Sequence, residues 1–219
     1  MKKKGRFELS THKILIINNS FLPVRIVFGG ENGIYFAVKE NPPKKYPNNI
    51  IFIIEQFFKA FRIEPTEITE IAVVVGPGSF TGTRISVVEG KILAYALKVP
   101  LIPLNSLDII GKGVKEGYAA IFAGRKEIFA AKFENGERKT EDMCLPFDEA
   151  ENMENLFFPS KEEARKSKLN NAKITEIPDT ALLELALKKA ESKEFVKDPL
   201  SVNPVYLRST DVIFKKKKK

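Results

Sequence analysis

An unbroken apolar run followed directly by a glycine-rich loop does most to limit how this chain can fold. The run covers residues 71–75, and such continuous segments are typical of strands buried on both faces of a sheet. The loop reads Gly76-Pro77-Gly78-Ser79-Phe80-Thr81-Gly82, and a helical pattern continues to about Lys98. A short strand then begins at residues 101–102, and Asn105 or Ser106 can cap a further helix. Because strands alternate with helices, this stretch predicts an α/β fold with a mostly parallel sheet.

The segments on either side of this unit predict further elements. Short apolar runs separated by turn residues indicate strands, and longer runs with helical spacing indicate helices. The predicted elements are strands at residues 14–17, 24–28 and 34–38, a helix over 48–62 that begins at Asn48 or Asn49, a hairpin over 118–133, a helix over 180–190 and an apolar segment over 202–207. The pattern is weak over residues 134–178. We expect a fuller N-terminal lobe over residues 1–115, a smaller C-terminal lobe over 116–214 and a lysine tail over 215–219.

The formal charge of +8 lies entirely in the two ends of the chain. Basic residues exceed acidic ones by eight, and eight lysines form the terminal runs 2–4 and 215–219, so the body between them is neutral. Terminal lysine runs are typically solvated, and they give only weak support for direct tRNA binding. Cys144 is the only cysteine, and no apolar run approaches the roughly 18 residues that span a bilayer. We therefore expect a cytoplasmic protein with no membrane partner.

The glycine-rich loop has two physical interpretations. Backbone N–H groups at the start of a helix can bind an anion. Alternatively, the glycines only permit a tight turn from strand to helix, with Ser79 or Thr81 as the helix cap. The loop is not a Walker A motif, because no Gly-Lys-Ser/Thr follows. Nor is it a nucleophile elbow, because Pro77 and Thr81 occupy the positions of the required glycines.

The loop and its surroundings resemble the TsaB (YeaZ) family. The resemblance covers residues 72–85 with the loop at their centre, residues 90–97, the segments Val99-Pro100-Leu101 and Asn105-Ser106-Leu107, and the tail Pro204-Val205-Tyr206-Leu207-Arg208. It implies an actin-like, ribonuclease-H-type fold. It also implies a subunit of the complex that forms threonylcarbamoyladenosine at tRNA position 37, with the catalytic paralogue TsaD and the ATPase TsaE as partners, tRNA reached indirectly, and a homodimer when the chain is alone.

Three departures from the family pattern bear on catalysis. Where many members carry Asp-Thr-Ser after the first strand, this chain has Asn18-Asn19-Ser20, and asparagine is a poorer ligand for Mg²⁺. Residues 122–125 lack the acid of the usual Asp-Ala-Arg, and residues 46–49 replace His-Ser-Glu. His12 is the only histidine, so neither a His-x-x-x-His metal pair nor a Ser–His pair is expected. We predict no catalytic residue, metal or cofactor; a degenerate ATPase or a peptidase-like enzyme is the alternative, and a tRNA-binding module a third.

The helices over residues 48–62 and 81–98 carry more apolar surface than one sheet can cover. The second helix has two apolar faces, of which Ile85, Val88, Ile92, Tyr95 and Ala96 form one. We assign the other apolar face of this helix, together with part of the helix over residues 48–62, to a docking surface for TsaD. The predicted interface residues are Ile50, Phe52, Ile53, Phe57, Arg84, Val87, Gly90, Lys91, Ala94 and Leu97. The alternative is that the chain's own C-terminal lobe buries both helices.

Overall fold

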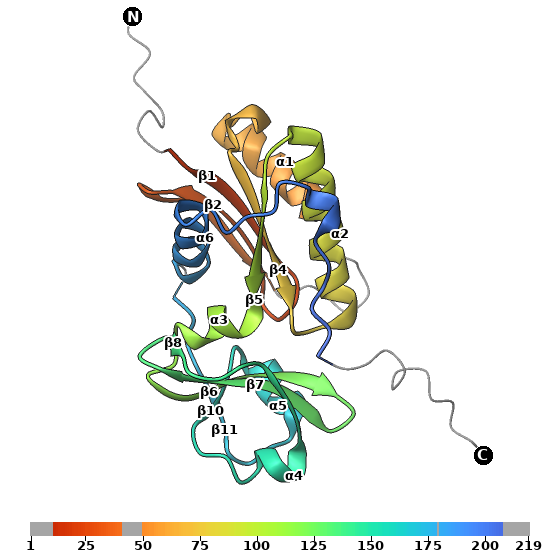
Figure 1. Ribbon diagram of the computed structural model, residues 1–219, viewed down its shortest axis with the longest axis vertical. Coiled ribbons are helices and arrows are strands. Elements are labelled where there is room, and N and C mark those ends of the chain that lie inside the picture. Colours follow the sequence, from red (N-terminus) through yellow and green to blue (C-terminus); the bar gives the residue numbers. More distant parts are fainter. Residues whose placement is uncertain (1–10, 41–49, 179, 208–219) are drawn as a thin grey trace, which may run out of the picture.

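The protein contains two β-sheets, one above the other in the computed structural model (Figure 1). The structure describes residues 11–40, 50–178 and 180–207. The lysine runs, the Asn48 and Asn49 caps, residues 46–49 and Arg208 lie outside these ranges. The first sheet has the order β3-β2-β1-β4-β5. Its strands are β1 (Lys13–Asn18), β2 (Val24–Gly30), β3 (Gly33–Glu40), β4 (Glu70–Gly76) and β5 (Leu101–Asn105). The first three pair antiparallel, and β1, β4 and β5 run parallel.

The two faces of this sheet belong to different parts of the core. Side chains alternate along a strand, so Leu15 and Val73 point to one face while Ile16 and Val74 point to the other. Helices α1 (Ile50–Phe61) and α2 (Phe80–Leu97) cover the first face. Helices α3 (Ser106–Gly111) and α6 (Ala181–Glu191) cover the second. Every residue of β4 is buried, which confirms the prediction of a strand covered on both sides.

The second sheet has six strands, most of them short, in the order β11-β10-β6-β7-β8, with β9 also pairing with β7. The predicted hairpin is present as β6 and β7, which pair antiparallel. The weakly patterned stretch after it holds only short elements. The bounds are β6 (Glu116–Gly124), β7 (Glu127–Glu134), β8 (Glu137–Arg138), β9 (Met143–Pro146), α4 (Phe147–Ala150), β10 (Leu156–Phe158), α5 (Lys161–Ser167) and β11 (Ala172–Ile174), with 3₁₀ turns at η1 (Pro65–Glu67) and η2 (Pro199–Ser201).

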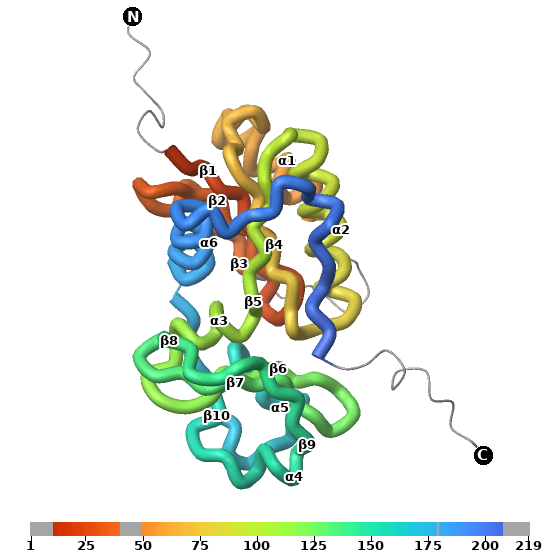
Figure 2. The backbone as a smooth tube through the Cα atoms, viewed as in Figure 1, coloured from red at the N-terminus to blue at the C-terminus, as the bar shows by residue number. Residues whose placement is uncertain are grey.

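After β11 the chain returns to the first sheet, which differs from the expectation that residues 116–214 lie together. Helix α6 packs on β1, β2 and β5, and Lys189 Nζ donates to Pro103 O at 3.1 Å. The amides of Leu101 and Val196 then donate to each other's carbonyl oxygens, at 3.0 and 2.8 Å. Figure 2 shows this last segment crossing from α6 to α2. The chain returns because the second face of the first sheet is apolar and is covered by α6, through Ala181, Leu182 and Leu183. The division near residue 115 stays a prediction.

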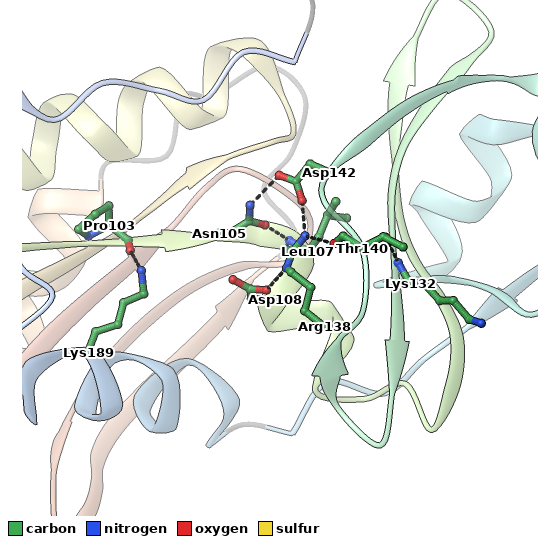
Figure 3. A network of polar contacts seen from close by, with 9 residues as sticks. All are labelled: Pro103, Asn105, Leu107, Asp108, Lys132, Arg138, Thr140, Asp142 and Lys189. Atoms are coloured by element: carbon green, nitrogen blue, oxygen red, sulfur yellow. Dashed lines mark hydrogen bonds and ion pairs between the residues drawn. The ribbon is translucent and has the colours of Figure 1, made fainter. Parts of the chain in front are cut away.

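An ion-pair network joins the two sheets (Figure 3). Arg138 at the end of β8 contacts Asp108 on α3 at 2.7 Å and Asp142 at 2.6 Å. Asn105 Nδ2 at the end of β5 donates to the second oxygen of Asp142 at 2.7 Å. The side chains of Arg138 and Asp142 are largely shielded from solvent, where charge-assisted hydrogen bonds are strongest. The network therefore fixes the β8–β9 connection against the end of β5.

Candidate functional site

The glycine-rich loop joins β4 to α2 by a tight turn. Gly76 has φ of +107°, a conformation that favours glycine. Ser79 is the helix cap, because its Oγ accepts a hydrogen bond from Gly82 N at 3.2 Å. Thr81, the alternative cap, lies exposed within the first turn of the helix.

The loop packs backbone to backbone against the turn that follows β1. A Cβ atom at Gly82 would lie 1.9 Å from Asn19 O, and one at Gly78 would lie 2.2 Å from Ser20 O. Ser79 N donates to Ser20 O at 2.7 Å. The side of the loop that faces the turn after β1 is thus occupied by the chain itself. This geometry supports the tight-turn interpretation of the loop over the anion-binding one.

Asn18 organises the same turn. Its side chain is fully buried, and Nδ2 donates to Phe21 O at 3.2 Å and to Pro23 O at 3.4 Å. Its Oδ1 accepts from Ser20 N at 3.1 Å. An aspartate here would direct a carboxylate oxygen at two carbonyl oxygens, so the amide suits this turn and the family acid does not. In the described part of the chain no three His, Cys, Asp or Glu side chains gather in a way that could hold a metal.

A cleft of about 510 Å³ lies between the loop and the second sheet. Apolar rings dominate its walls, including Phe80, Phe122 and Phe129. The carboxylate on its wall, Glu163, is buried and pairs with Lys166 at 2.9 Å. His12 pairs with Glu70 at the start of β4, whereas the loop follows the end of that strand. The histidine and the cleft therefore lie at opposite ends of the strand, and the charged groups on the cleft wall are Arg125, Glu163 and Lys166.

Arg84, a predicted interface residue, instead holds the C-terminal segment. Its Nε donates to Tyr206 Oη at 2.8 Å, and its guanidinium lies 3.7 Å from the centre of the Phe80 ring. Cation–π contacts of this kind stabilise by about 0.5–2 kcal/mol. Val205 N also donates to Val75 O at 2.7 Å. The segment that resembles the family tail is thereby fixed across the start of α2.

The structure reverses the two apolar faces of α2. Val87, Gly90 and Ala94 were predicted to meet a partner, yet they are buried against the chain's own sheet. The reason is steric: a Cβ atom at Gly90 would lie 2.0 Å from Val73 Cγ1, so small residues on this face let α2 approach β4. Ile50 on α1 is likewise fully buried. These four residues form part of the chain's own core.

The outward sides of α1 and α2 carry several exposed apolar side chains. Of the other predicted interface residues, Phe52 is exposed and Ile53, Phe57, Lys91 and Leu97 are partly buried. Val88, Ile92 and Tyr95, from the face assigned to the chain's own sheet, are 53%, 60% and 66% exposed. A groove of about 650 Å³ runs between the two helices, lined by side chains that include Ile51 and Leu97. We name as the exposed α1–α2 face the residues Ile51, Phe52, Val88, Ile92 and Tyr95.

One carboxyl group interrupts this apolar surface. Glu89 lies on α2, and its neighbours one turn away are Ile85, Ser86, Ile92 and Leu93. Its Oε2 is buried and has no hydrogen-bond partner within residues 11–40, 50–178 and 180–207. Burial raises the pKa of this carboxyl to about 7. Sequence spacing shows only that Glu89 lies between the two apolar faces of the helix. It does not show whether a hydrogen-bond donor meets the carboxyl group.

Comparison with known proteins identifies the family. Residues 40–195 match the family model described as TsaD, tRNA N6-adenosine threonylcarbamoyltransferase, which covers more than half of the chain. The chain is 24% identical to the tRNA threonylcarbamoyladenosine biosynthesis protein TsaB of Haemophilus influenzae, over 88% of this chain and 91% of that protein. The chain belongs to the TsaD family, among its TsaB (YeaZ) members.

Two further comparisons agree with this assignment. The TsaB protein of Buchnera aphidicola from Acyrthosiphon pisum is 27% identical over 47% of this chain, and the match spans about half (49%) of that relative's length. The structure of YeaZ from Pseudomonas aeruginosa has a TM-score of 0.71 and 21% identity, with 90% of this chain and 100% of that chain covered. The expected actin-like α/β fold of the TsaB proteins is therefore confirmed. None of the helices in the described ranges is both long and apolar enough to cross a membrane.

The packing of the TsaB loop predicts the effect of one added methyl group. Gly82→Ala should lower the free energy of unfolding by about 1–3 kcal/mol, because the new Cβ would press on the backbone of Asn19. Thermal and urea unfolding followed by circular dichroism measure the change. Thr81→Ala, at the exposed neighbouring position, is the control and should lose much less. Equal stability of the two variants would contradict the close packing described here.

Glu89 predicts an unusual dependence of stability on pH. The folded chain binds the Glu89 proton up to about pH 7, whereas the unfolded chain releases it near pH 4.5. The folded state is therefore progressively disfavoured as the pH rises from about 4.5 to 7. Glu89→Gln should stabilise the chain at pH 8 by about 1–2 kcal/mol, a value discounted for partial solvation, and much less at pH 5. Urea unfolding at both pH values tests this, with the exposed Glu55→Gln as control; no gain at pH 8 would refute it.

Proposed function

We propose that this chain is a non-catalytic subunit in the formation of N6-threonylcarbamoyladenosine on tRNA and that it binds and supports the catalytic paralogue TsaD. The observation that carries the proposal is the exposed α1–α2 face. Among the eleven large apolar side chains of the described residues that are most exposed, seven lie on α1 and α2. Exposed apolar side chains that gather on neighbouring helices are a feature of protein–protein interfaces. The names of the TsaB relatives supply the pathway.

The geometry around the loop supports a subunit without chemistry of its own. The side-chain amide of Asn18 is hydrogen-bonded within the turn after β1, and the backbone of Asn19 and Ser20 packs against one side of the loop. In this proposal the ATPase TsaE joins the complex through TsaD, and tRNA is contacted through TsaD. The chain alone forms a homodimer through the same exposed α1–α2 face.

The docking proposal predicts the effect of one charge on this face. Ile92→Glu should weaken binding to TsaD from the same genome by about 30-fold or more, because an unpaired carboxylate would enter an apolar interface. The fold should survive, since Ile92 is 60% exposed. Isothermal titration calorimetry measures the dissociation constant. Ile174→Glu, at a 49% exposed position on β11, is the matched control and should bind normally. Wild-type affinity in a folded Ile92→Glu variant would place the docking surface elsewhere.

The absence of catalysis is tested separately. Purified chain with ATP and Mg²⁺ should show no steady-state turnover above background, because Asn18 replaces the acid that family members carry. A coupled phosphate-release assay measures this. Turnover that scales with protein concentration and disappears in Lys166→Ala, a variant of the cleft, would favour the degenerate ATPase instead.

A further inference from the structure

We infer that the docking partner of the exposed α1–α2 face places a basic side chain, a lysine or an arginine, against Glu89. The inference rests on the proposed function, because it requires that this face meets a partner. It specifies which chemical group the partner presents opposite Glu89. A purely apolar partner would leave the carboxylate of Glu89 buried without a counter-charge.

The first support is the position of Glu89 within the face. Val88 and Ile92, on either side of it along α2, are both more than half exposed. Ile85 and Leu93, one turn before and after Glu89, pack partly on the core beneath α2. A surface that covers Val88 and Ile92 therefore also covers Glu89 and removes the solvent that now reaches the carboxyl.

The second support is that Glu89 has no compensation within the described chain. It forms no ion pair among the described residues, and its Oε2 has no hydrogen-bond partner there. A buried acceptor without a donor is destabilising, and an uncompensated carboxylate more so. Burial raises the pKa of the group to about 7, as expected where no cation stabilises the charged form. A leucine or glutamine would serve better if the position only had to pack.

Among the described residues, none of the charged groups on the elements around α2 forms an ion pair with Glu89. On α2 itself, Arg84 is bonded to Tyr206, and Lys91 lies two positions along and faces away from Glu89. On the neighbouring elements, three ion pairs are Lys59 with Glu55, Lys13 with Glu67, and His12 with Glu70. Arg62 and Glu64 line the groove between α1 and α2. Asp198 accepts a hydrogen bond from Leu200 N, and Lys197 lies beside it. The described residues thus supply no counter-charge for Glu89, and the inference assigns that role to a basic group of the partner.

The sign of the pH dependence separates this inference from its alternative. A basic partner group selects the ionised form of Glu89, so binding should tighten as the pH rises through 7. An apolar partner would select the protonated form, and binding would then tighten as the pH falls. Between pH 6 and pH 8 the ionised fraction of a group that titrates near 7 rises about tenfold, which sets the size of the effect.

The test measures the affinity of the full chain for TsaD from the same genome at pH 6, 7 and 8. Wild-type protein should bind about tenfold more tightly at pH 8 than at pH 6. The part of the pH dependence that comes from Glu89 should be absent in Glu89→Gln and Glu89→Leu. At pH 8 both variants should bind TsaD about tenfold or more weakly than wild type. Glu154→Gln, an exposed acidic position far along the chain in the second-sheet region, is the control and should behave as wild type.

Each outcome bears on the inference. A wild-type affinity that is greater at pH 6, or a pH dependence that persists unchanged in Glu89→Gln, would overturn it while leaving the docking proposal intact. No binding at any pH, or unchanged binding by Ile92→Glu, would overturn the docking proposal and this inference together. Because Glu89→Gln is expected to fold more stably than wild type at pH 8, loss of binding there cannot be attributed to unfolding.

Discussion

The close approach of α2 to the first sheet is the constraint on which the rest of the structure depends. Three glycines make it possible: Gly78 and Gly82 admit the backbone of the turn after β1, and Gly90 admits a side chain of β4. A helix held this near to a sheet cannot turn about its axis, because any Cβ on the inward side would meet backbone or buried side chains. The inward face of α2 is thereby fixed, and so is its outward face. The exposed apolar surface is a consequence of how the inner surface packs.

The same packing explains what the sequence could and could not reveal. The strand at residues 71–75, the loop and the following helix were predictable because apolar runs and glycines act locally. The orientation of α2 was not, because both of its faces are apolar and a 100° projection gives no preference between them. Gly90 and Ala94 are predicted interface residues, whereas in the structure these small residues let α2 approach β4. The signal that could have shown which face of α2 packs inward is a buried strand next to a helix that contains a glycine.

Contacts between distant segments were equally out of reach. The network around Arg138 joins residues about 30 positions apart, and the bond from Arg84 to Tyr206 spans 122 positions. Neither follows from periodicity, since both require knowledge of how the sheets are placed. The environment of Glu89 is of the same kind, because sequence spacing does not show that no described residue donates a hydrogen bond to its Oε2. Asn18 was correctly noticed as a departure from the family pattern, but its role in the turn became clear only from its three hydrogen bonds.

The return of the chain to the first sheet has a consequence for the order of folding. The first sheet is built from residues 13–105, yet one of its faces is covered by α6, which begins at Ala181. During synthesis, Ile14, Ile16, Ala72 and Val74 therefore have only α3 as cover until α6 has been made after the second sheet. An N-terminal fragment that ends with the second sheet would carry this apolar face permanently, which favours aggregation. The second sheet is topologically an insertion, and residues 181–207 complete a unit that residues 13–105 begin.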